Sequence, residues 1–345
     1  MRWLVDARPL TDATSGGVGR VSRHLLKAFT RLATDDETVL ATTGSQPPTT
    51  DVLPTGSNVR HVHLRVPNKL WSLGCMTGFA AIDETCERRA GTVDATFLPN
   101  LGFVGELRRP TVLLLHDLSF LIEPRWFSRR ARLWHQAVDA TAQIRRATHL
   151  LAVSETTRCD AMRLLDIPGD RITVIPIGAT FESVAPRSTL HAPRARYVLA
   201  LGADDSRKNA ATATEAVAAL RHEPRFEDVE LVLVGSPTCP RPSDAELADL
   251  YRHASAFLYP SWYEGYGLPL HEAAAFGTPC IASTAGALLE TAPPGTLFAD
   301  PAKPHHWVEA LKIALSIQTQ DVRISAQPWD QAASILLATL RGVTH

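Results

Sequence analysis

Short apolar runs alternate along this chain with longer stretches in which apolar side chains recur every three or four positions. Runs such as Thr111–Leu115, Tyr197–Leu201 and Ala256–Tyr259 are nearly continuous, as in parallel strands that are buried on both faces. Residues 19–32 instead carry apolar side chains at the period of a helix. Repeated along the chain, this alternation predicts an α/β protein with parallel sheets.

The alternation is interrupted once, near the middle of the chain. Residues 179–195 are rich in proline, serine and threonine and have no apolar period, which is typical of a linker. A chain of 345 residues is also long for a single hydrophobic core. We therefore predict two domains, over residues 1–178 and 196–327, joined by this linker and followed by a last helix over about 328–345.

One loop between a predicted strand and a predicted helix carries the clearest candidate chemistry. It runs from Glu264 to Leu268, and Pro269 follows in the first turn of the helix. Its glycines allow backbone N–H groups to turn toward a ligand, and the helix N-terminus adds partial positive charge. The loop therefore suits an anion or a sugar.

Two carboxylates accompany this loop, Glu264 within it and Glu272 inside the following helix. Ionised carboxylates accept hydroxyl hydrogen bonds strongly, so both could face a hydroxyl-rich ligand held over the helix start. The alternative interpretation is a solvated loop acid and a partner of the helix dipole.

Two cations stand before another predicted helix. Arg207 and Lys208 belong to the loop G-A-D-D-S-R-K-N, which precedes the helix Ala210–Leu220. Cations are unfavourable at a helix start, and a bound diphosphate would compensate for them. We expect Asn209 to be the N-cap of the helix. The two aspartates of the loop lack a third ligand and are weak evidence for a metal.

Two loops in the first half also follow predicted strands. The segment Ser15–Arg20, S-G-G-V-G-R, could cradle a phosphate, although a plain tight turn is the alternative. It lacks the G-x-G-x-x-G spacing and the acidic residue at the end of the second strand, which argues against NAD. His116 and Asp117 follow the strand Thr111–Leu115, where open α/β sheets place their chemistry. A histidine bonded to a backbone carbonyl at the edge of the core is the alternative there.

Composition narrows the class of protein. The net charge of −1 gives no general reason to expect nucleic acid. The five cysteines are odd in number, widely spaced and without C-x-x-C pairs, so reduced cytosolic thiols are expected rather than disulfides or zinc. We identify neither a signal peptide nor an apolar run as long as a membrane span, and we expect a cytoplasmic protein.

A basic and aromatic stretch lies between Arg125 and Arg145. Five arginines there alternate with Trp126, Phe127 and Trp134, and Ser128 is placed to cap a helix that continues to Ala147. Such a stretch suits an anionic membrane surface or the phosphates of a lipid-linked acceptor. The alternative is a solvated helix face with a buried apolar side.

Taken together, these strings resemble a known family. The linked string E-G-Y-G-L-P-L-H-E, followed by A-x-A-x-G-T-P, resembles the E-x7-E signature of retaining glycosyltransferases of family 4, which have the GT-B fold. The strings S-G-G-V-G-R, V-x-x-x-H-D-L and R-K-N are similar to others of that family. The resemblance implies two Rossmann-like, doubly wound parallel-sheet domains facing across a cleft. It also implies that the last helix packs back on the first domain.

The resemblance also implies roles for individual residues. Glu264 would contact the donor hexose, Glu272 would hold the ribose hydroxyls, and His116 would lie beside the donor sugar. Arg207 and Lys208 would bind the pyrophosphate. The remaining donor-binding positions, which act through their backbone, are Gly16, Gly17, Gly265, Tyr266, Gly267 and Leu268.

From the resemblance we expect a metal-independent, retaining hexosyltransferase without a cofactor. It would move a hexose, mannose as the first choice, from a GDP- or UDP-sugar to a hydroxyl acceptor such as a lipid-linked glycan. Polysaccharide, O-antigen or glycolipid biosynthesis would be its pathway, at the inner face of the membrane. A GT-B epimerase, a phosphorylase-like enzyme and a non-catalytic sugar-nucleotide binder remain alternatives.

Two departures from the family pattern stand out. His271 occupies a position where a small or aliphatic residue is usual. Only residues 236–244 separate the predicted strand Leu231–Gly235 from the next helix, where the family usually inserts another helix and a strand. We therefore expect a smaller second sheet and leave the nucleotide base undecided.

Overall fold

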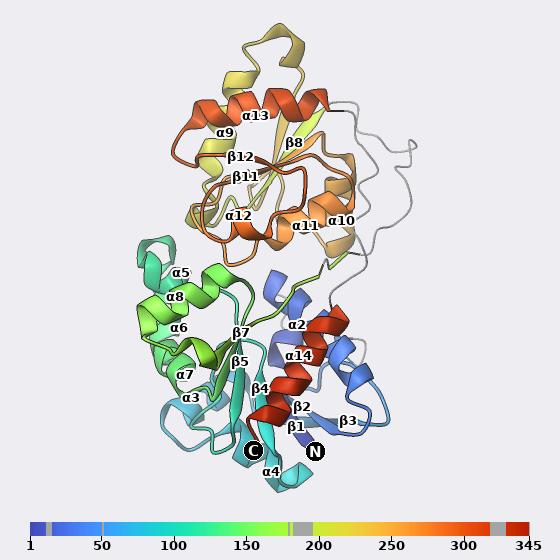
Figure 1. The fold of residues 1–345 in the computed structure, drawn as a ribbon, viewed down its shortest axis with the longest axis vertical. Helices are drawn as coiled ribbons and strands as arrows, with labels where there is room; N and C mark the ends of the chain where they lie inside the picture. Colours follow the sequence, from blue (N-terminus) through green and yellow to red (C-terminus); the bar gives the residue numbers. More distant parts are fainter. Residues whose placement is uncertain (12–15, 50–51, 179, 182–195, 318–328, 345) are drawn as a thin grey trace. The chain divides into compact units, whose positions relative to one another are not determined.

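The structure is a computed structural model that describes residues 1–11, 16–49, 52–178, 180–181, 196–317 and 329–344 (Figure 1). The described residues form two compact units. The first lies within Met1–Leu121, Ser128–Gly178 and Gln327–His345, and the second within Ile122–Phe127 and Ala179–Ala326. The linker expected over 179–195 lies outside the described residues, apart from Thr180 and Phe181.

The first unit is built on a seven-stranded parallel sheet in the order β3-β2-β1-β4-β5-β6-β7. Its strands are β1 (Arg2–Asp6), β2 (Glu37–Thr43), β3 (Val59–Leu64), β4 (Ala95–Leu98), β5 (Thr111–Leu115), β6 (His149–Ala152) and β7 (Ile172–Val174). Its described helices are α1 (Arg8–Thr11), α2 (Gly16–Leu32), α3 (Asn68–Met76), α4 (Ile82–Ala90), α5 (Ser119–Ile122), α6 (Arg129–Ala137), α7 (Ala140–Arg146), α8 (Glu155–Leu165) and α14 (Trp329–Gly342).

The second unit is built on a five-stranded parallel sheet in the order β12-β11-β10-β8-β9. Its strands are β8 (Tyr197–Leu201), β9 (Glu230–Val234), β10 (Ala256–Tyr259), β11 (Cys280–Ser283) and β12 (Leu297–Ala299). Its described helices are α9 (Ala210–Leu220), α10 (Asp244–His253), α11 (Leu268–Ala275), α12 (Leu288–Thr291) and α13 (Pro304–Ser316). The two parallel sheets confirm the predicted α/β fold class.

The continuous apolar runs become strands because both faces of each sheet are covered. Residues of β5 and β10 are buried along their whole length, and core clusters lie on the two sides of the second sheet. Trp307 and Tyr251, both 0% exposed, belong to opposite clusters of that sheet. A strand buried on both faces has no place for polar alternation, which explains the pattern in the sequence.

The strand order of the second sheet determines where the loops that carry the candidate residues come together. In the second sheet β8 is flanked by β9 on one side and β10 on the other, so the order reverses between β8 and β10. Loops that follow two such strands leave the sheet in opposite directions and open a crevice at their carboxyl ends. The loops after β8 and β10 contain Arg207, Lys208 and Glu264.

Three details differ from the predictions. The helix expected to run from Ser128 to Ala147 is interrupted at Asp139, whose φ of +51° is left-handed, although Ser128 does accept a hydrogen bond from Ala131 N as a cap. Asn209 lies at the start of α9 but makes no side-chain cap; its Nδ2 donates to Pro260 O and Pro301 O instead. The basic stretch is divided, since residues 122–127 belong to the second unit and Arg125 pairs with Glu123.

The short segment after β9 has the expected consequence. A tight turn closed by one bridge, between Ser236 and Cys239, follows β9, and residues 240–243 then lead directly into α10. The described sheet therefore ends at β9, with five strands against seven in the first unit. No helix in the described part of the chain is both long enough and apolar enough to cross a membrane.

The last helix, α14, packs against α2 of the first unit (Figure 1). Leu336 and Leu340 are 0% exposed, and the ring of Trp329 stacks on His24 with 5.4 Å between centroids. Arg341 Nη2 also reaches Asp36 Oδ2 at 2.8 Å. A segment far along the sequence thereby completes the core of the first unit.

We expect Leu336→Ala to destabilise the first unit by ~2–5 kcal/mol, because truncating a buried leucine leaves a cavity. Amide hydrogen exchange should speed up in α2 and β1 and stay unchanged in β8 and β10. Gln331→Ala, at an exposed position of the same helix, is the control and should change stability by less than ~0.5 kcal/mol. Equal acceleration in both units would contradict the packing of α14 on the first unit.

Candidate functional site

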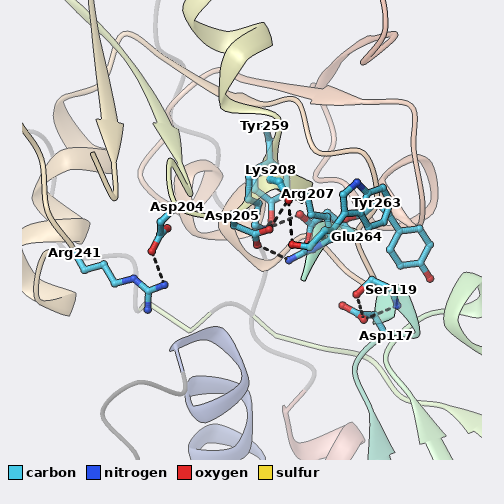
Figure 2. A network of polar contacts seen from close by, with 12 residues as sticks. Asp117, Ser119, Asp204, Asp205, Arg207, Lys208, Arg241, Tyr259, Tyr263 and Glu264 are labelled. Carbon is cyan, nitrogen blue, oxygen red and sulfur yellow. Dashed lines mark hydrogen bonds and ion pairs between the residues drawn. The ribbon is translucent and has the colours of Figure 1, made fainter. Parts of the chain in front are cut away.

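A buried carboxylate with two cationic partners forms the centre of the candidate site. Lys208 Nζ lies 2.6 Å from Glu264 Oε1, and Arg207 Nη1 lies 2.9 Å from Glu264 Oε2. The side chains of Glu264, Arg207 and Lys208 are only 8%, 14% and 15% exposed. Figure 2 shows both cations converging on Glu264 from the loop after β8. Each carboxylate oxygen thus has its own cation, and the three residues predicted separately lie together.

Burial and charge have opposite effects on Glu264. Burial alone would raise the pKa of its carboxyl group, but Arg207 and Lys208 outweigh burial and lower that pKa to about 2. Burial and the neighbouring Arg207 lower the pKa of Lys208, while Glu264 opposes them. At neutral pH Glu264 is therefore an anion that the two cations stabilise.

Tyr259 is a site residue that the sequence reasoning missed. It ends β10, and its hydroxyl oxygen accepts a hydrogen bond of 2.6 Å from Lys208 Nζ. The same ammonium lies 4.6 Å from the centroid of the tyrosine ring. Burial, then the charge of Glu264, raises the pKa of Tyr259 well above its usual value, and Glu272 contributes in the same direction. Both carboxylates therefore act on this one hydroxyl.

Arg207 is held by its surroundings as well as by Glu264. Its Nη1 donates to Tyr263 O at 2.7 Å, its Nη2 lies 3.3 Å from Asp205 Oδ2, and its own carbonyl accepts from Trp262 N at 2.8 Å. A planar guanidinium with several fixed contacts loses little freedom when it binds an anion. The loops after β8 and β10 are thereby joined side by side.

Two glycines make room for this cluster. A Cβ on Gly202, whose φ is +85°, would lie 2.4 Å from Lys208 Cγ. A Cβ on Gly286, whose φ is +60°, would lie 2.5 Å from Glu264 O and 2.7 Å from Glu264 N. Ala287 N also donates to Glu264 O at 2.9 Å, so the loop after β11 holds the Glu264 backbone in place. Gly286 is the second residue that sequence reasoning missed.

Glu272 lies in a different polar environment. It is 0% exposed on α11, its Oε1 accepts from Thr180 Oγ1 at 2.6 Å and its Oε2 accepts from Tyr251 OH at 3.1 Å. Each carboxylate oxygen thus binds one hydroxyl, as a vicinal diol would require. Thr180 and Tyr251 were not foreseen as its partners.

The four loop residues between the carboxylates lead into α11. Gly267 has a φ of +92° and precedes the helix, and a Cβ there would lie 2.5 Å from Leu288 Cδ2. Gly265 and Leu268 are buried, whereas Tyr266 is half-buried and stacks on His271 with 4.8 Å between ring centroids. Burial lowers the pKa of His271 to about 4, although a hydrogen bond with the Thr291 backbone acts in the opposite direction. The imidazole is therefore neutral at pH 7.

The candidate residues of the first unit form a separate group. His116 follows β5, and its Nε2 lies 2.9 Å from Pro99 O, which can only accept, so Nε2 carries the proton. Burial lowers the pKa of His116, and the imidazole is neutral at pH 7. Asp117 Oδ1 accepts from Ser119 N and Ser119 Oγ (Figure 2). The hydrogen bond from His116 to the Pro99 carbonyl is the contact predicted by the alternative interpretation, a histidine bonded to a backbone carbonyl at the edge of the core.

Gly16 and Gly17 begin α2. Gly16 is exposed with a φ of +51°, and no described atom lies within 4 Å of the position of a Cβ. A helix of seventeen residues presents unpaired N–H groups and partial positive charge at this end. The described part of the chain thus places an accessible helix start after β1. Among the described residues no group of three or more His, Cys, Asp and Glu side chains is arranged to hold a metal ion.

Comparisons with known proteins agree with this arrangement. The family model described as Glycosyltransferase Family 4 matches residues 15–182, and the model described as Glycosyl transferases group 1 matches residues 195–316. Between them the two models cover most of both units and all of the candidate residues.

Two curated relatives are similar over part of the chain. The MMP alpha-(1->4)-mannosyltransferase of Mycolicibacterium hassiacum is 33% identical over 192 residues, which are 49% of this chain and 46% of that protein. The O-antigen chain mannosyltransferase B of Escherichia coli is 29% identical over 237 residues, which are 59% and 60% of the two chains. The chain therefore spans roughly half of the length of these relatives.

Solved structures share the fold over the whole chain. Sucrose-phosphate synthase from Thermosynechococcus elongatus has a TM-score of 0.67 at 18% identity and covers 100% of this chain and 96% of its own. HepE from Anabaena, in complex with UDP-glucose, has a TM-score of 0.59 at 16% identity, with coverages of 100% and 97%. At these identities the likeness concerns the fold alone.

We expect Glu264→Gln to lower stability at pH 7 by ~3–5 kcal/mol, because two buried cations lose their carboxylate. In the native protein the stabilisation by Glu264 is complete above its usual pKa of 4.5 and is lost as pH falls toward its folded pKa of about 2. Urea unfolding at several pH values should show this acid loss in the native protein and a flatter profile in the variant. Glu215→Gln, at an exposed position on α9, should leave the profile unchanged.

Gly286→Ala tests the support behind Glu264. The added Cβ meets the Glu264 backbone, so exchange of the Ala287 amide proton should accelerate and the melting temperature should fall. Gly295→Ala is the matched control, since Gly295 also has a positive φ, +84°, but no described atom within 4 Å of its Cβ position. Similar effects of the two substitutions would mean that backbone strain alone, worth ~1–3 kcal/mol, explains the loss.

Proposed function

The chain belongs to the family 4 glycosyltransferases, and on that premise we propose that it transfers a hexose from a nucleotide diphosphate sugar to a hydroxyl acceptor with retention of configuration. The observation that carries this proposal is the buried cluster of Arg207 and Lys208 on Glu264, held at the point where the second sheet reverses its strand order. Anionic ligands of α/β proteins bind at such points.

The similar proteins support the donor class. The two curated relatives named above are mannosyltransferases, one of them acting on an O-antigen chain, and HepE was solved with UDP-glucose. We propose a nucleotide-activated mannose as the first donor to test and polysaccharide, O-antigen or glycolipid synthesis as the setting. The base stays open between GDP and UDP, because the shortened segment after β9 changes the region where the family recognises it.

The chemistry assigned to the second unit is electrostatic. The bond between the sugar C1 and the diphosphate oxygen breaks, and Arg207 and Lys208 stabilise the charge that develops on the diphosphate. A carboxylate has about four acceptor sites, so Glu264 can bind both cations and still accept a hydroxyl of the hexose. The N-terminus of α11 and the amides of residues 265–268 add partial positive charge. Glu272, which already binds one hydroxyl at each oxygen, would hold the ribose.

The acceptor hydroxyl then attacks C1 on the face that the diphosphate leaves, and its proton passes to the departing phosphate oxygen. In the first unit, His116 and the backbone at Gly16 and Gly17 would lie beside the transferred sugar. This reaction requires neither a metal nor a cofactor, and we propose that the enzyme acts without them. We further propose a lipid-linked glycan as acceptor and a peripheral contact of the first unit with the cytoplasmic face of the membrane.

A screen of GDP-, UDP- and dTDP-sugars by thermal shift and hydrolysis should identify the donor, and NMR of the product should show a retained linkage. Lys208→Ala should lower kcat by ~10²–10³-fold, the usual cost of removing one preorganised charge-stabilising donor. Lys303→Ala, at a cation of the same unit that is 54% exposed, is the control and should keep full activity. An inverted linkage, or full activity of Lys208→Ala, would contradict the mechanism.

The same screen separates the other classes of protein. Turnover of the nucleotide sugar or of a sugar phosphate without acceptor would indicate an epimerase or a phosphorylase-like enzyme. Donor binding without any turnover, surviving Glu264→Ala, would indicate a non-catalytic binder.

A further inference from the structure

Helix α3 of the first unit carries large apolar side chains on its outward side as well as on its inward side. Trp71, 3% exposed, and the partly buried Cys75 face inward, where both donate to Phe103 O. The outward side carries Leu70, Leu73 and Met76, which are 60%, 56% and 57% exposed, and Phe79 just beyond the helix is 91% exposed. Large apolar side chains that gather on an exposed face often mark an interaction site. The outward side of α3 is therefore adapted to a partner.

Helix α6 lies on the same side of the unit (Figure 1) and also exposes large apolar side chains. None of its residues is buried, and Leu133 and Trp134 are 64% and 37% exposed. The ring of Phe103, whose carbonyl binds α3, meets the ring of Trp134 edge-on with 6.4 Å between centroids. Figure 1 shows α3 and α6 along one edge of the first unit. Six of the fourteen exposed large hydrophobic side chains of the described chain thus lie on these two segments.

The charges beside these side chains have one sign. Lys69 on α3 and Arg129, Arg130 and Arg132 on α6 are exposed, and among the described residues none has a carboxylate partner. Neither helix contains an aspartate or a glutamate. Several exposed arginines elsewhere in the unit are paired, as Arg88 is with Glu84 at 2.7 Å. Uncompensated cations beside exposed apolar side chains are unexpected in a chain whose net charge is −1.

We propose that this face, formed by α3 with Phe79 and by α6, docks on an anionic lipid bilayer. Phosphate headgroups would neutralise the four cations, and the leucines, Met76, Phe79 and Trp134 would enter the boundary with the acyl chains. A second copy of the same face would bring like charges together, and a nucleic acid would leave the apolar side chains in water. A lipid surface satisfies both properties at once.

This inference rests on the proposed function and deepens it, because it identifies the surface through which the enzyme would reach a lipid-linked acceptor. The arginine-rich stretch alone did not define that surface: Arg125 is paired with Glu123, and Ser206 Oγ donates to Trp126 O within the second unit. The apolar residues of α3, which lie far from α6 in the sequence, complete it.

Flotation with vesicles tests the proposal. The full chain should float with vesicles of phosphatidylcholine that contain about one third phosphatidylglycerol, and not with phosphatidylcholine alone. The triple variant Leu73→Ser, Met76→Ser, Phe79→Ser should bind at least about tenfold less, and so should the variant Arg129→Gln, Arg130→Gln, Arg132→Gln. All six positions are exposed, so circular dichroism and thermal melting should match the native protein.

Matched controls replace exposed residues elsewhere. Leu289→Ser, at a side chain that is 61% exposed in the second unit, and Arg88→Gln, at an arginine 73% exposed, should keep native vesicle binding. The proposal is overturned if the native chain does not float, if either triple variant floats like the native chain, or if light scattering shows a dimer that the same variants dissociate. Hydrolysis of the donor in solution should be unchanged in the triple variants. Vesicle binding without any donor turnover would contradict the proposed function and leave this surface intact.

Discussion

Glu264 can remain ionised inside the second unit only because Arg207 and Lys208 each lie within 3 Å of one of its oxygens. A buried charge without partners is too costly for a domain of ordinary stability, so the three residues must be placed together or not at all. That requirement also constrains the backbone around the three residues. Gly202 leaves space for the Lys208 side chain, Gly286 leaves space for the Glu264 backbone, and β8 and β10 must be neighbours for their loops to meet.

The same constraint explains why the cluster is suited to chemistry rather than to stability alone. A buried ion pair is seldom more stabilising than apolar packing of the same volume. Here the cations are also oriented before any ligand arrives, by Tyr259, Tyr263 and Asp205. Preorganised charge in a region of low dielectric stabilises a developing anion far better than the same groups in water. The two carboxylates differ in their partners, because Glu264 contacts two cations and Glu272 accepts hydrogen bonds from two hydroxyls.

The first unit is organised by a different interaction, the packing of α14 on α2. The end of the chain thereby covers the helix whose start carries Gly16 and Gly17, so the opening glycine loop depends on residues more than three hundred positions away. Whereas α14 covers α2, nothing in the described chain covers the outward sides of α3 and α6, which expose apolar and cationic side chains to solvent. Contiguous exposed apolar surfaces often mark sites of interaction.

The sequence by itself determined the fold class, most strands and the identity of the chemically distinctive residues. Buried parallel strands require continuous apolar runs, and Arg207, Lys208 and Glu264 stand in loops directly after such runs. Only the tertiary structure decided which residues support them. Tyr259 looked like the end of an apolar strand, Thr180 stood at the edge of a presumed linker, and Gly286 had no pattern of its own, yet each contacts a site residue or makes room for one. Their roles come from contacts between segments distant along the chain, and local periodicity carries no information about such contacts.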